Sequence, residues 1–304
     1  MRKLTLSALL VAAIGMPVVA QEAARTSFEL PGEGLHPEGI AYDSASNSLF
    51  VSGAGTGEIL RIDRESGEVT AFVEASGVPF SVLGLEVADG QLWVAGASTG
   101  EIRAYSIEDG SQTFTASTGE GGLLNDLTVS STGDVYVTDS NRPILYRVAA
   151  GSDEAEEWLD FTGTAFEYID DVNANGIVIT EDDEHLIIAQ LATGQLYLVD
   201  VASQEVQEID AGETFPGADG LVLDGNTLYV VQNGADQVAV VELADNYLTG
   251  SVATVYTSPD FLMPATAVLV DGELIITNTQ FGELGTGNAD LPFRLSVVPV
   301  TAAE

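Results

Sequence analysis

Four polar residues occupy the same position in a short phrase that recurs along the chain. Glu38, Asn125, Asn175 and Asp219 each begin such a phrase, whereas the two other copies begin with apolar Leu83 and Ala265. If the six copies are equivalent strands around one axis, the four oxygen-bearing side chains point at one spot. Carboxylate and amide oxygens are the ligands that calcium prefers. The pattern therefore predicts a calcium site with Glu38, Asn125, Asn175 and Asp219 as its metal ligands.

Two other interpretations of these residues are available. Asn-Gly and Asp-Gly pairs form turns, which explains any one of the four but not the register that all four share. The segment 171–182 also begins like an EF-hand calcium loop, with Asn175 inside it. Asp182 stands there in place of the usual glutamate, and no flanking helix is expected, so the shared site remains the main prediction.

The spacing of the phrases indicates the architecture. Their second residues are at positions 39, 84, 126, 176, 220 and 266, so the intervals are 45, 42, 50, 44 and 46 residues. Periods of this length that contain only strand signals are typical of propeller blades. The first period accommodates four strands, at 39–42, 48–51, 58–62 and 69–73. Hairpin pairs such as Asp89-Gly90 and Asp271-Gly272 separate strands of this kind.

The last period lacks one strand, and the start of the mature chain can supply it. Strands are expected at 267–269, 273–277 and 295–298, after which the chain ends. Residues 26–30 alternate in polarity and would fill the fourth place, which removes an exposed sheet edge. We therefore predict an all-β protein, a single six-bladed β-propeller over 21–304 with four-stranded blades, closed by the mature N-terminal strand.

The first 20 residues have the pattern of a cleavable signal peptide. Arg2 and Lys3 precede a short apolar stretch at 4–14, and small residues at 18–20 offer a cleavage site. The stretch is too short to span a bilayer, and no later run reaches about 18 apolar residues. We expect an exported protein, periplasmic or extracellular, without membrane insertion; a retained N-terminal anchor is the alternative.

Composition limits the chemistry and the partners. The chain has no cysteine, which excludes disulfides and a thiol nucleophile, and only two histidines, which disfavours zinc. Its formal net charge is -38, from 47 acidic residues against nine Lys and Arg. Such a charge repels nucleic acid and anionic membranes. It fits either adaptation to concentrated salt or the ordinary acidity of an exported bacterial protein.

The phrases resemble the senescence-marker-protein/gluconolactonase family and its relatives, diisopropylfluorophosphatase and the paraoxonases. The segments that carry the resemblance are 36–39, 124–126, 174–176 and 218–220. The resemblance implies a calcium ion in the channel of a six-bladed propeller, and hydrolysis of lactones, related esters or phosphotriesters. It implies metal ligation by Glu38, Asn175 and Asp219, ligation or substrate binding by Asn125, and a role for Asp219 as base or nucleophile.

The chain departs from this family at two positions. Leu123 stands where the sugar lactonases have an arginine, and Ala265 with Thr266 stand where some relatives have a histidine. A more apolar lactone or ester is therefore expected, with Leu123 and Tyr168 beside Asn125 as substrate-binding candidates. The neighbouring Leu83, Phe166 and Phe215 are candidates too, and packing within the blades is the alternative role for the aromatic residues.

Asp126 and His36 are predicted to support the site without ligating the ion. A turn role is the alternative for Asp126, and a loop-capping role is the alternative to proton transfer for His36. A second structural ion is left open, and no obligate protein partner is evident. The competing class is a non-catalytic binding propeller that keeps calcium as a structural plug. A quinone-dependent dehydrogenase finds no supporting residue cluster.

Overall fold

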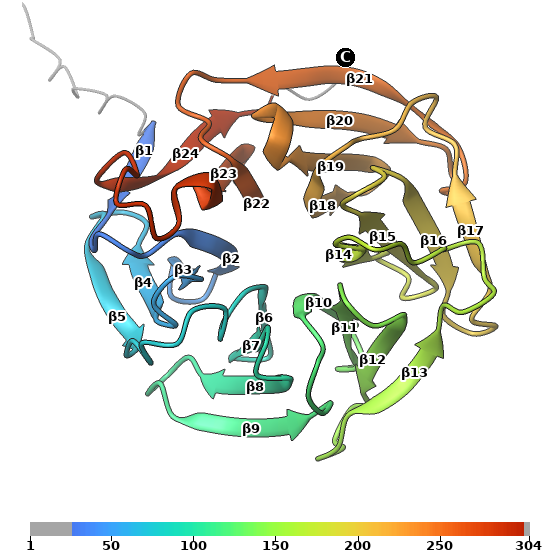
Figure 1. Ribbon diagram of the computed structural model, residues 1–304, viewed down its shortest axis with the longest axis horizontal. Helices are drawn as coiled ribbons and strands as arrows, with labels where there is room; N and C mark the ends of the chain where they lie inside the picture. The colour runs from blue at the N-terminus through green and yellow to red at the C-terminus, as the bar shows by residue number, and fades with distance from the viewer. Residues whose placement is uncertain (1–25, 301–304) are drawn as a thin grey trace, which may run out of the picture.

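Six four-stranded antiparallel sheets surround one axis in the structure, a computed structural model that describes residues 26–300 (Figure 1). The predicted all-β, six-bladed propeller with four-stranded blades is confirmed. Helix in residues 26–300 is limited to two short 3-10 turns, η1 (Asn233–Ala235) and η2 (Phe281–Glu283). The predicted signal peptide at 1–20 lies outside the described residues. No helix within 26–300 has the length and apolar run that a membrane crossing requires.

Each blade contributes one strand to each of four concentric positions. The innermost strands are β2 (Pro37–Asp43), β6 (Leu85–Ala88), β10 (Leu124–Val129), β14 (Ala174–Ile179), β18 (Ala218–Asp224) and β22 (Pro264–Val270). The second strands are β3 (Ser48–Gly53), β7 (Gln91–Ala95), β11 (Val135–Asp139), β15 (His185–Gln190), β19 (Thr227–Gln232) and β23 (Glu273–Asn278). The third strands are β4 (Ile59–Asp63), β8 (Glu101–Ser106), β12 (Ile144–Val148), β16 (Leu196–Asp200), β20 (Gln237–Leu243) and β24 (Phe293–Pro299). The outer strands are β5 (Val69–Val73), β9 (Gln112–Ser117), β13 (Glu156–Asp160), β17 (Val206–Ile209), β21 (Gly250–Thr257) and β1 (Ser27–Leu30).

The first and the last strands of the described chain share a sheet. β1 pairs antiparallel with β24, from Ser27 opposite Ser296 to Leu30 opposite Phe293. Figure 1 shows β1 in blue beside β24 in red. The sheet order β1-β24-β23-β22 makes β1 the outermost strand of the sixth blade.

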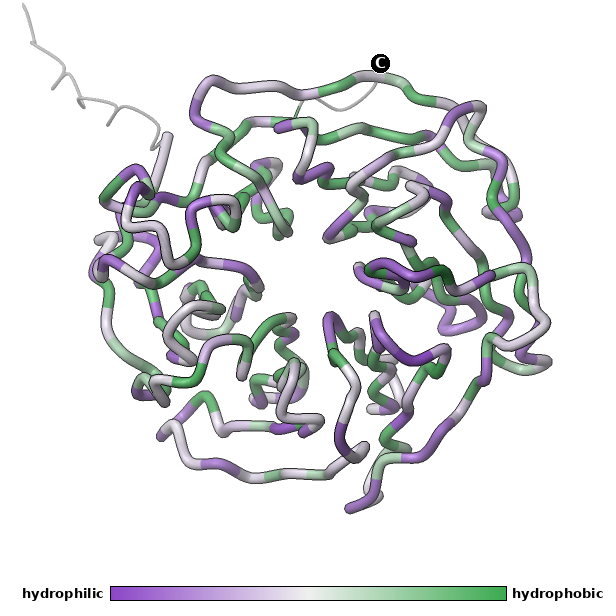
Figure 2. The backbone as a smooth tube through the Cα atoms, viewed as in Figure 1, coloured by the Kyte–Doolittle hydropathy of each residue, from purple (hydrophilic) through white to green (hydrophobic). Residues whose placement is uncertain are grey.

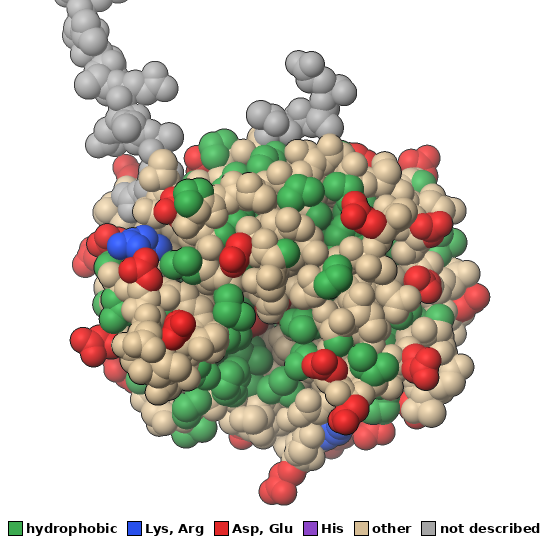
Figure 3. All heavy atoms as spheres, turned by 45° about the horizontal axis from the view of Figure 1, so that its top comes forward, with side chains coloured by type: hydrophobic (Ala, Val, Ile, Leu, Met, Phe, Trp, Pro, Cys, Tyr) green, Lys and Arg blue, Asp and Glu red, His purple; other side chains and the backbone are tan. Residues whose placement is uncertain are grey.

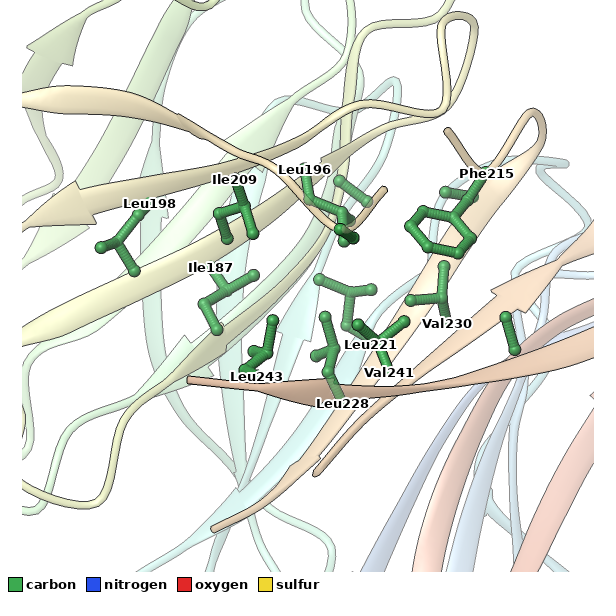
Figure 4. Close-up of a cluster of buried hydrophobic side chains, with 14 residues drawn as sticks. Ile187, Leu196, Leu198, Ile209, Phe215, Leu221, Leu228, Val230, Val241 and Leu243 are labelled. Carbon is green, nitrogen blue, oxygen red and sulfur yellow. The ribbon is translucent and has the colours of Figure 1, made fainter. Parts of the chain in front are cut away.

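Apolar layers between neighbouring blades form the core. The second strand of the first blade, β3, is buried on both faces, which is why 49–51 reads as an unbroken apolar run rather than an alternating one. One such layer joins β15–β17 to β18–β20 and includes Ile187, Leu221 and Val230 (Figure 4). Figure 2 shows that the hydrophobic colour lies mainly on the inner and middle strands. Burying one such side chain contributes roughly 1.5–3 kcal/mol, so each layer holds two blades together without helices.

The turns have the chemistry that their sequences indicate. Asp89 and Gly90 both have positive φ, of 50° and 72°, as do Asp271 and Gly272, at 51° and 77°. Two successive positive φ angles are typical of the type I′ turn, which Asp-Gly favours. These hairpins lie at the end of the blades opposite the four predicted ligands.

Candidate metal centre

A bulge interrupts the pairing of five of the six inner strands at the position of the repeated phrase. In each, two residues lie opposite one residue of the second strand, as Glu38 and Gly39 lie opposite Ser52 between the pairs Pro37–Gly53 and Ile40–Val51. The equivalent shifts are between Leu124 and Leu127, Ala174 and Ile177, Ala218 and Leu221, and Pro264 and Ala267. A bulge redirects a side chain relative to its strand. The shared register of the four predicted ligands therefore has a common local cause.

Hydroxyl groups on the second strands stabilise two of these bulges and join them to the next blade. The amide of Asp126 donates to Thr138 Oγ1 at 3.1 Å, and Thr138 Oγ1 donates to the Asn175 carbonyl at 2.8 Å. The amide of Thr266 donates to Thr277 Oγ1 at 3.1 Å, and Thr277 Oγ1 donates to the Glu38 carbonyl at 2.7 Å. Each threonine thus fixes a predicted ligand in the neighbouring blade.

Glycine in the phrase allows neighbouring inner strands to approach each other closely. A Cβ at Gly176 would lie 2.2 Å from the Asp219 carbonyl oxygen, and one at Gly84 would lie 2.3 Å from Asp126 Oδ1. These distances are too short for any side chain. The glycines therefore allow the ring of inner strands to narrow at the level of the predicted ligands.

The four predicted ligands are buried at this narrow level. The exposed fractions are 5% for Glu38, 6% for Asn125, 3% for Asn175 and 5% for Asp219. Leu83 and Ala265 complete the ring as buried apolar residues. A buried carboxylate or amide without partners costs free energy, so the partners of each oxygen decide what this ring can bind.

Asn125 presents an oxygen with no partner. Its Nδ2 donates to Ser140 Oγ at 2.9 Å, and Ser140 Oγ donates to the Ala174 carbonyl at 2.7 Å. Because the amide nitrogen is held by Ser140, Oδ1 is left as a buried acceptor without a hydrogen bond. Glu38 Oε2 is likewise a buried acceptor without a hydrogen bond.

Asp219 is oriented by two amides. Asn233 Nδ2 donates to Asp219 Oδ2 at 2.9 Å, and the Asn175 side chain also bonds this carboxylate. Neither amide carries a charge, so the negative charge of an ionised Asp219 is not neutralised by them. Asn175 therefore lies beside Asp219.

Asp126 adds a third carboxylate to the two predicted ones. Its Oδ1 accepts from the Leu127 amide at 2.9 Å, and its Oδ2 accepts from the Ile177 amide at 3.4 Å. Burial raises the pKa of Asp126 to about 7, although those two bonds oppose the rise. Asp126 also lines the cavity of the central channel. A role in a turn, the alternative considered from the sequence, does not account for this position.

Neighbouring carboxyl groups raise the pKa values of Asp219 and Glu38 further. Burial raises the pKa of Asp219 to about 7, and Asp126 adds to the rise while Asn233 and Asn175 oppose it. Burial, then Asp219, then Asp126 hold the pKa of Glu38 well above its ordinary value. Three carboxylates this close to one another favour the binding of either protons or a cation. Together with the unpartnered oxygens of Glu38 and Asn125, the donor set fits a hard divalent cation such as calcium.

The central channel continues below the ring and contains a residue that the sequence analysis missed. A cavity of 330 Å³ is lined by the inner strands, with Asp126 and Glu86 among its polar residues. Burial raises the pKa of Glu86 to about 8, against bonds from the Val129 amide and the Thr128 hydroxyl. Glu86 is not in the ring register, so the repeat gave no signal for it.

Apolar side chains lie beside the ring on the side of the second blade. Ala54, Leu83 and Ala97 form a buried cluster, against which Phe80, Leu123 and Phe281 pack. Figure 3 shows hydrophobic side chains gathered around the central hollow, while acidic side chains are spread over the surface. Leu123 thus lies on an apolar surface next to the ring.

The other supporting candidates have defined partners. His36 is buried, and its Nδ1 lies 2.8 Å from the Thr279 carbonyl. The Tyr168 hydroxyl donates to the Asp139 carbonyl at 2.7 Å, and its ring packs against Phe161 and Phe166. Tyr168 is therefore not brought into the ring. Phe166 and Phe215 are buried in the blade cores, which agrees with the packing role.

Three residues that hold Asn125, Asp219 or His36 occupy equivalent places in their blades, which sequence reasoning did not use. Ser140, Asn233 and Thr279 each directly follow the second strand of a blade, after β11, β19 and β23. They contact Asn125, Asp219 and His36 respectively. A polar residue just after an apolar second-strand run is the signal that could have identified them.

A separate group of possible metal ligands lies in an exposed turn. Oxygen and nitrogen atoms of Asp182, Glu184 and His185 lie within 4.8 Å of one another. The turn joins β14 to β15, at the end of the blade opposite the ring. Because 174–179 form strand β14, the EF-hand interpretation of 171–182 is wrong.

The fold and the ring define a six-bladed β-propeller with a candidate metal centre at one mouth of its channel. A family model described as outer membrane protein assembly factor BamB matches residues 21–247, which is more than half of the chain, and the chain belongs to this family. A search among curated proteins found no match.

Solved structures share the propeller fold at low sequence identity. Regucalcin from Agrobacterium tumefaciens, described as a calcium-binding protein, has a TM-score of 0.66 at 17% identity over 88% of this chain and 92% of its own. A gluconolactonase from Xanthomonas campestris has a TM-score of 0.61 at 17% identity over 87% and 86%. Virginiamycin B lyase from Staphylococcus aureus has a TM-score of 0.61 at 14% identity over 91% and 88%. These identities establish the fold alone.

Proposed function

We propose that this protein is an exported, calcium-dependent hydrolase of a small lactone or related ester. The observation that carries the proposal is the ring itself: buried Glu38 Oε2 and Asn125 Oδ1 have no partner, and they lie at the register of Asn175 and Asp219. Two carboxylates and two amides suit calcium, with open positions left for substrate and water. The gluconolactonase and regucalcin neighbours support this choice of chemistry.

The residues of the ring and of the apolar cluster beside it would have different roles in hydrolysis. Glu38, Asn125, Asn175 and Asp219 would hold the ion. Bound calcium would polarise the carbonyl of the substrate and stabilise the negative charge that develops on its oxygen. Asn125 is kept in one orientation by Ser140, and the apolar cluster at Leu83 and Leu123 excludes water from one side of the carbonyl.

Asp219 would act as general base or as nucleophile. As a base, it accepts a proton from water while the water oxygen bonds to the carbonyl carbon, and it returns the proton to the departing alkoxide as the ester C–O bond breaks. Asn233 holds Oδ2, which fixes the direction of the carboxylate. His36 is less suited to this step because it lines the neighbouring cavity beside the first blade and not the central channel.

A chromogenic panel tests the proposal. Purified protein should hydrolyse at least one aryl ester or aromatic lactone in calcium, and a chelator should abolish the activity. Asp219→Asn should abolish both turnover and ion retention, whereas Asp224→Asn, at the exposed far end of the same strand, should change neither. Turnover that survives chelation in the wild-type protein would contradict the proposed role of the ion.

The second candidate is a binding propeller in which the cation is structural. The family description, an assembly factor, favours this class. Under it, chelation should lower the melting temperature, and no member of the panel should be hydrolysed. The two candidates therefore differ in turnover and not in metal content.

A further inference from the structure

A second cavity opens on the ring side of the molecule, beside the first blade. It has a volume of 420 Å³, and its walls are mostly small residues, such as Gly34, Gly55 and Ala289. Its polar side chains are His36, Glu33 and Glu283. His36 lies two residues before Glu38, so the Cα atoms of these two residues are at most about 7 Å apart. The proposed metal centre does not use this cavity.

His36 offers this cavity a hydrogen-bond acceptor. The Thr279 carbonyl can only accept, so His36 Nδ1 carries a hydrogen, and Nε2 of the neutral ring is an acceptor. Within residues 26–300, Nε2 has no hydrogen-bond partner, and it is not among the fully enclosed unpaired atoms. His36 lines the cavity together with Gly55. A Cβ built on Gly55 would lie 3.0 Å from His36 Cδ2. The free edge of the imidazole therefore faces the open space.

The charged groups of the cavity are both acidic. Glu33 is exposed at its rim, and Glu283 is partly buried and accepts a bond from Thr286 at 2.7 Å. Among the described residues, no lysine or arginine lines the cavity. A ligand must therefore supply the hydrogen-bond donor and, for the best match, a positive charge.

Aromatic rings connect the cavity to the apolar cluster at the ring. Phe281 stacks on His36 with ring centroids 6.4 Å apart, and it lies 5.7 Å from Phe80. Phe80 and Phe281 also pack on the cluster of Leu83. An apolar segment of a substrate can follow this surface from the ring to the cavity.

From these contacts we propose that the cavity is the subsite for an ammonium group, so that the substrate is an apolar lactone or ester that bears a protonated amine. The amine donates to His36 Nε2 and pairs with Glu33 and Glu283, while its carbon chain lies along Phe281 and Phe80. The same carboxylates repel carboxylated substrates. The identity of the substrate rests on the proposed hydrolase function, but binding of the amine does not.

Calorimetry with three probes of matched size tests the subsite at fixed ionic strength. Phenethylamine should bind the full-length protein, 2-phenylethanol more weakly, and phenylacetate not at all. Glu283→Gln and Glu33→Gln should each weaken phenethylamine by at least about threefold, the size of an exposed charge pair. Asp245→Asn, in the exposed turn between β20 and β21 on the opposite face, controls for general attraction of cations.

Equal loss of binding in Asp245→Asn, or equal affinity for the amine and the alcohol, would overturn the subsite. Hydrolysis of 4-(aminomethyl)phenyl acetate against 4-methylphenyl acetate then separates the two proposals. Preference for the amine ester that disappears in Glu283→Gln supports both. Amine binding that depends on Glu283 without hydrolysis of either ester keeps the subsite and rejects the hydrolase. Hydrolysis with no preference for the amine ester keeps the hydrolase and rejects the subsite.

Discussion

Ser140 accepts a hydrogen bond of 2.9 Å from Asn125 Nδ2, and this bond turns Asn125 Oδ1 toward a place where it has no partner. An amide that could rotate would place either oxygen or nitrogen at the ring. With its nitrogen held by Ser140, the amide presents its oxygen, the only one of the two atoms that can bind a cation. The orientation of the ligand is thus set by a residue 15 positions away, directly after strand β11.

Ser140→Ala should weaken calcium binding by about 10- to 100-fold, the usual effect of removing a group that orients a ligand. The measurement is calcium affinity by calorimetry. Ser130→Ala serves as the matched control, because Ser130 bonds within the turn between β10 and β11, at the opposite end of the same strands. Equal calcium affinity in Ser140→Ala and in the wild-type protein would show that Asn125 does not bind the ion.

The repeat in the sequence was sufficient to predict the blades and the common register of four polar residues. The apolar runs marked the second strands, and the Asp-Gly pairs marked the turns. The bulges could not be predicted, because an extra residue in one strand is visible only once its partner is known. Ser140 and Asn233 were missed because periodicity identifies a strand and not the residue that follows it. Glu86 points into the channel from an inner strand whose ring residue is apolar, and so nothing drew attention to it.

The metal-free protein should become less stable as the pH rises from about 4 to 8. Asp126 and Asp219 have pKa values near 7 in the folded protein, and Glu86 near 8. Their unfolded values are about 4. Between these limits the folded state holds more protons than the unfolded state, so stability is present at low pH and is lost as the pH increases. Melting temperatures in chelator at pH 5, 6, 7 and 8 measure this loss.

Calcium should cancel that pH dependence, because a bound cation favours the ionised carboxylates. Asp126→Asn should reduce the decline in chelator, whereas Asp224→Asn, on an exposed strand end, should leave it unchanged. A metal-free melting temperature that stays level or rises from pH 5 to 8 is incompatible with this electrostatic description of the ring.

Thr277→Val should lower the free energy of unfolding by about 1–3 kcal/mol, because it leaves a buried acceptor and a bulge amide without partners. The acceptor is the Glu38 carbonyl and the amide is that of Thr266. Denaturant titration measures the change, and Thr70→Val on the exposed strand β5 is the control. Thr277→Val should also weaken calcium binding, since Thr277 helps to fix Glu38. If the variant is as stable as the control, the blades are not joined by this bond.

The acidic surface should make the stability of the protein depend on salt. A formal net charge of -38 implies strong repulsion at low ionic strength, and salt screens it within a Debye length of about 3 Å at 1 M. We expect the melting temperature to rise steadily from low to molar NaCl. A melting temperature independent of salt would favour ordinary acidity over adaptation to a saline habitat.

Calorimetric titration of calcium into chelator-treated protein is the most direct test of the ring as a metal centre, with Glu38→Gln and Asp219→Asn titrated in parallel. We predict that the wild-type protein binds one equivalent of calcium tightly and that both variants lose this binding. The melting temperatures of both variants in chelator should stay at or above that of the wild-type protein. No binding by the folded wild-type protein, or undiminished binding by both variants, would contradict the account.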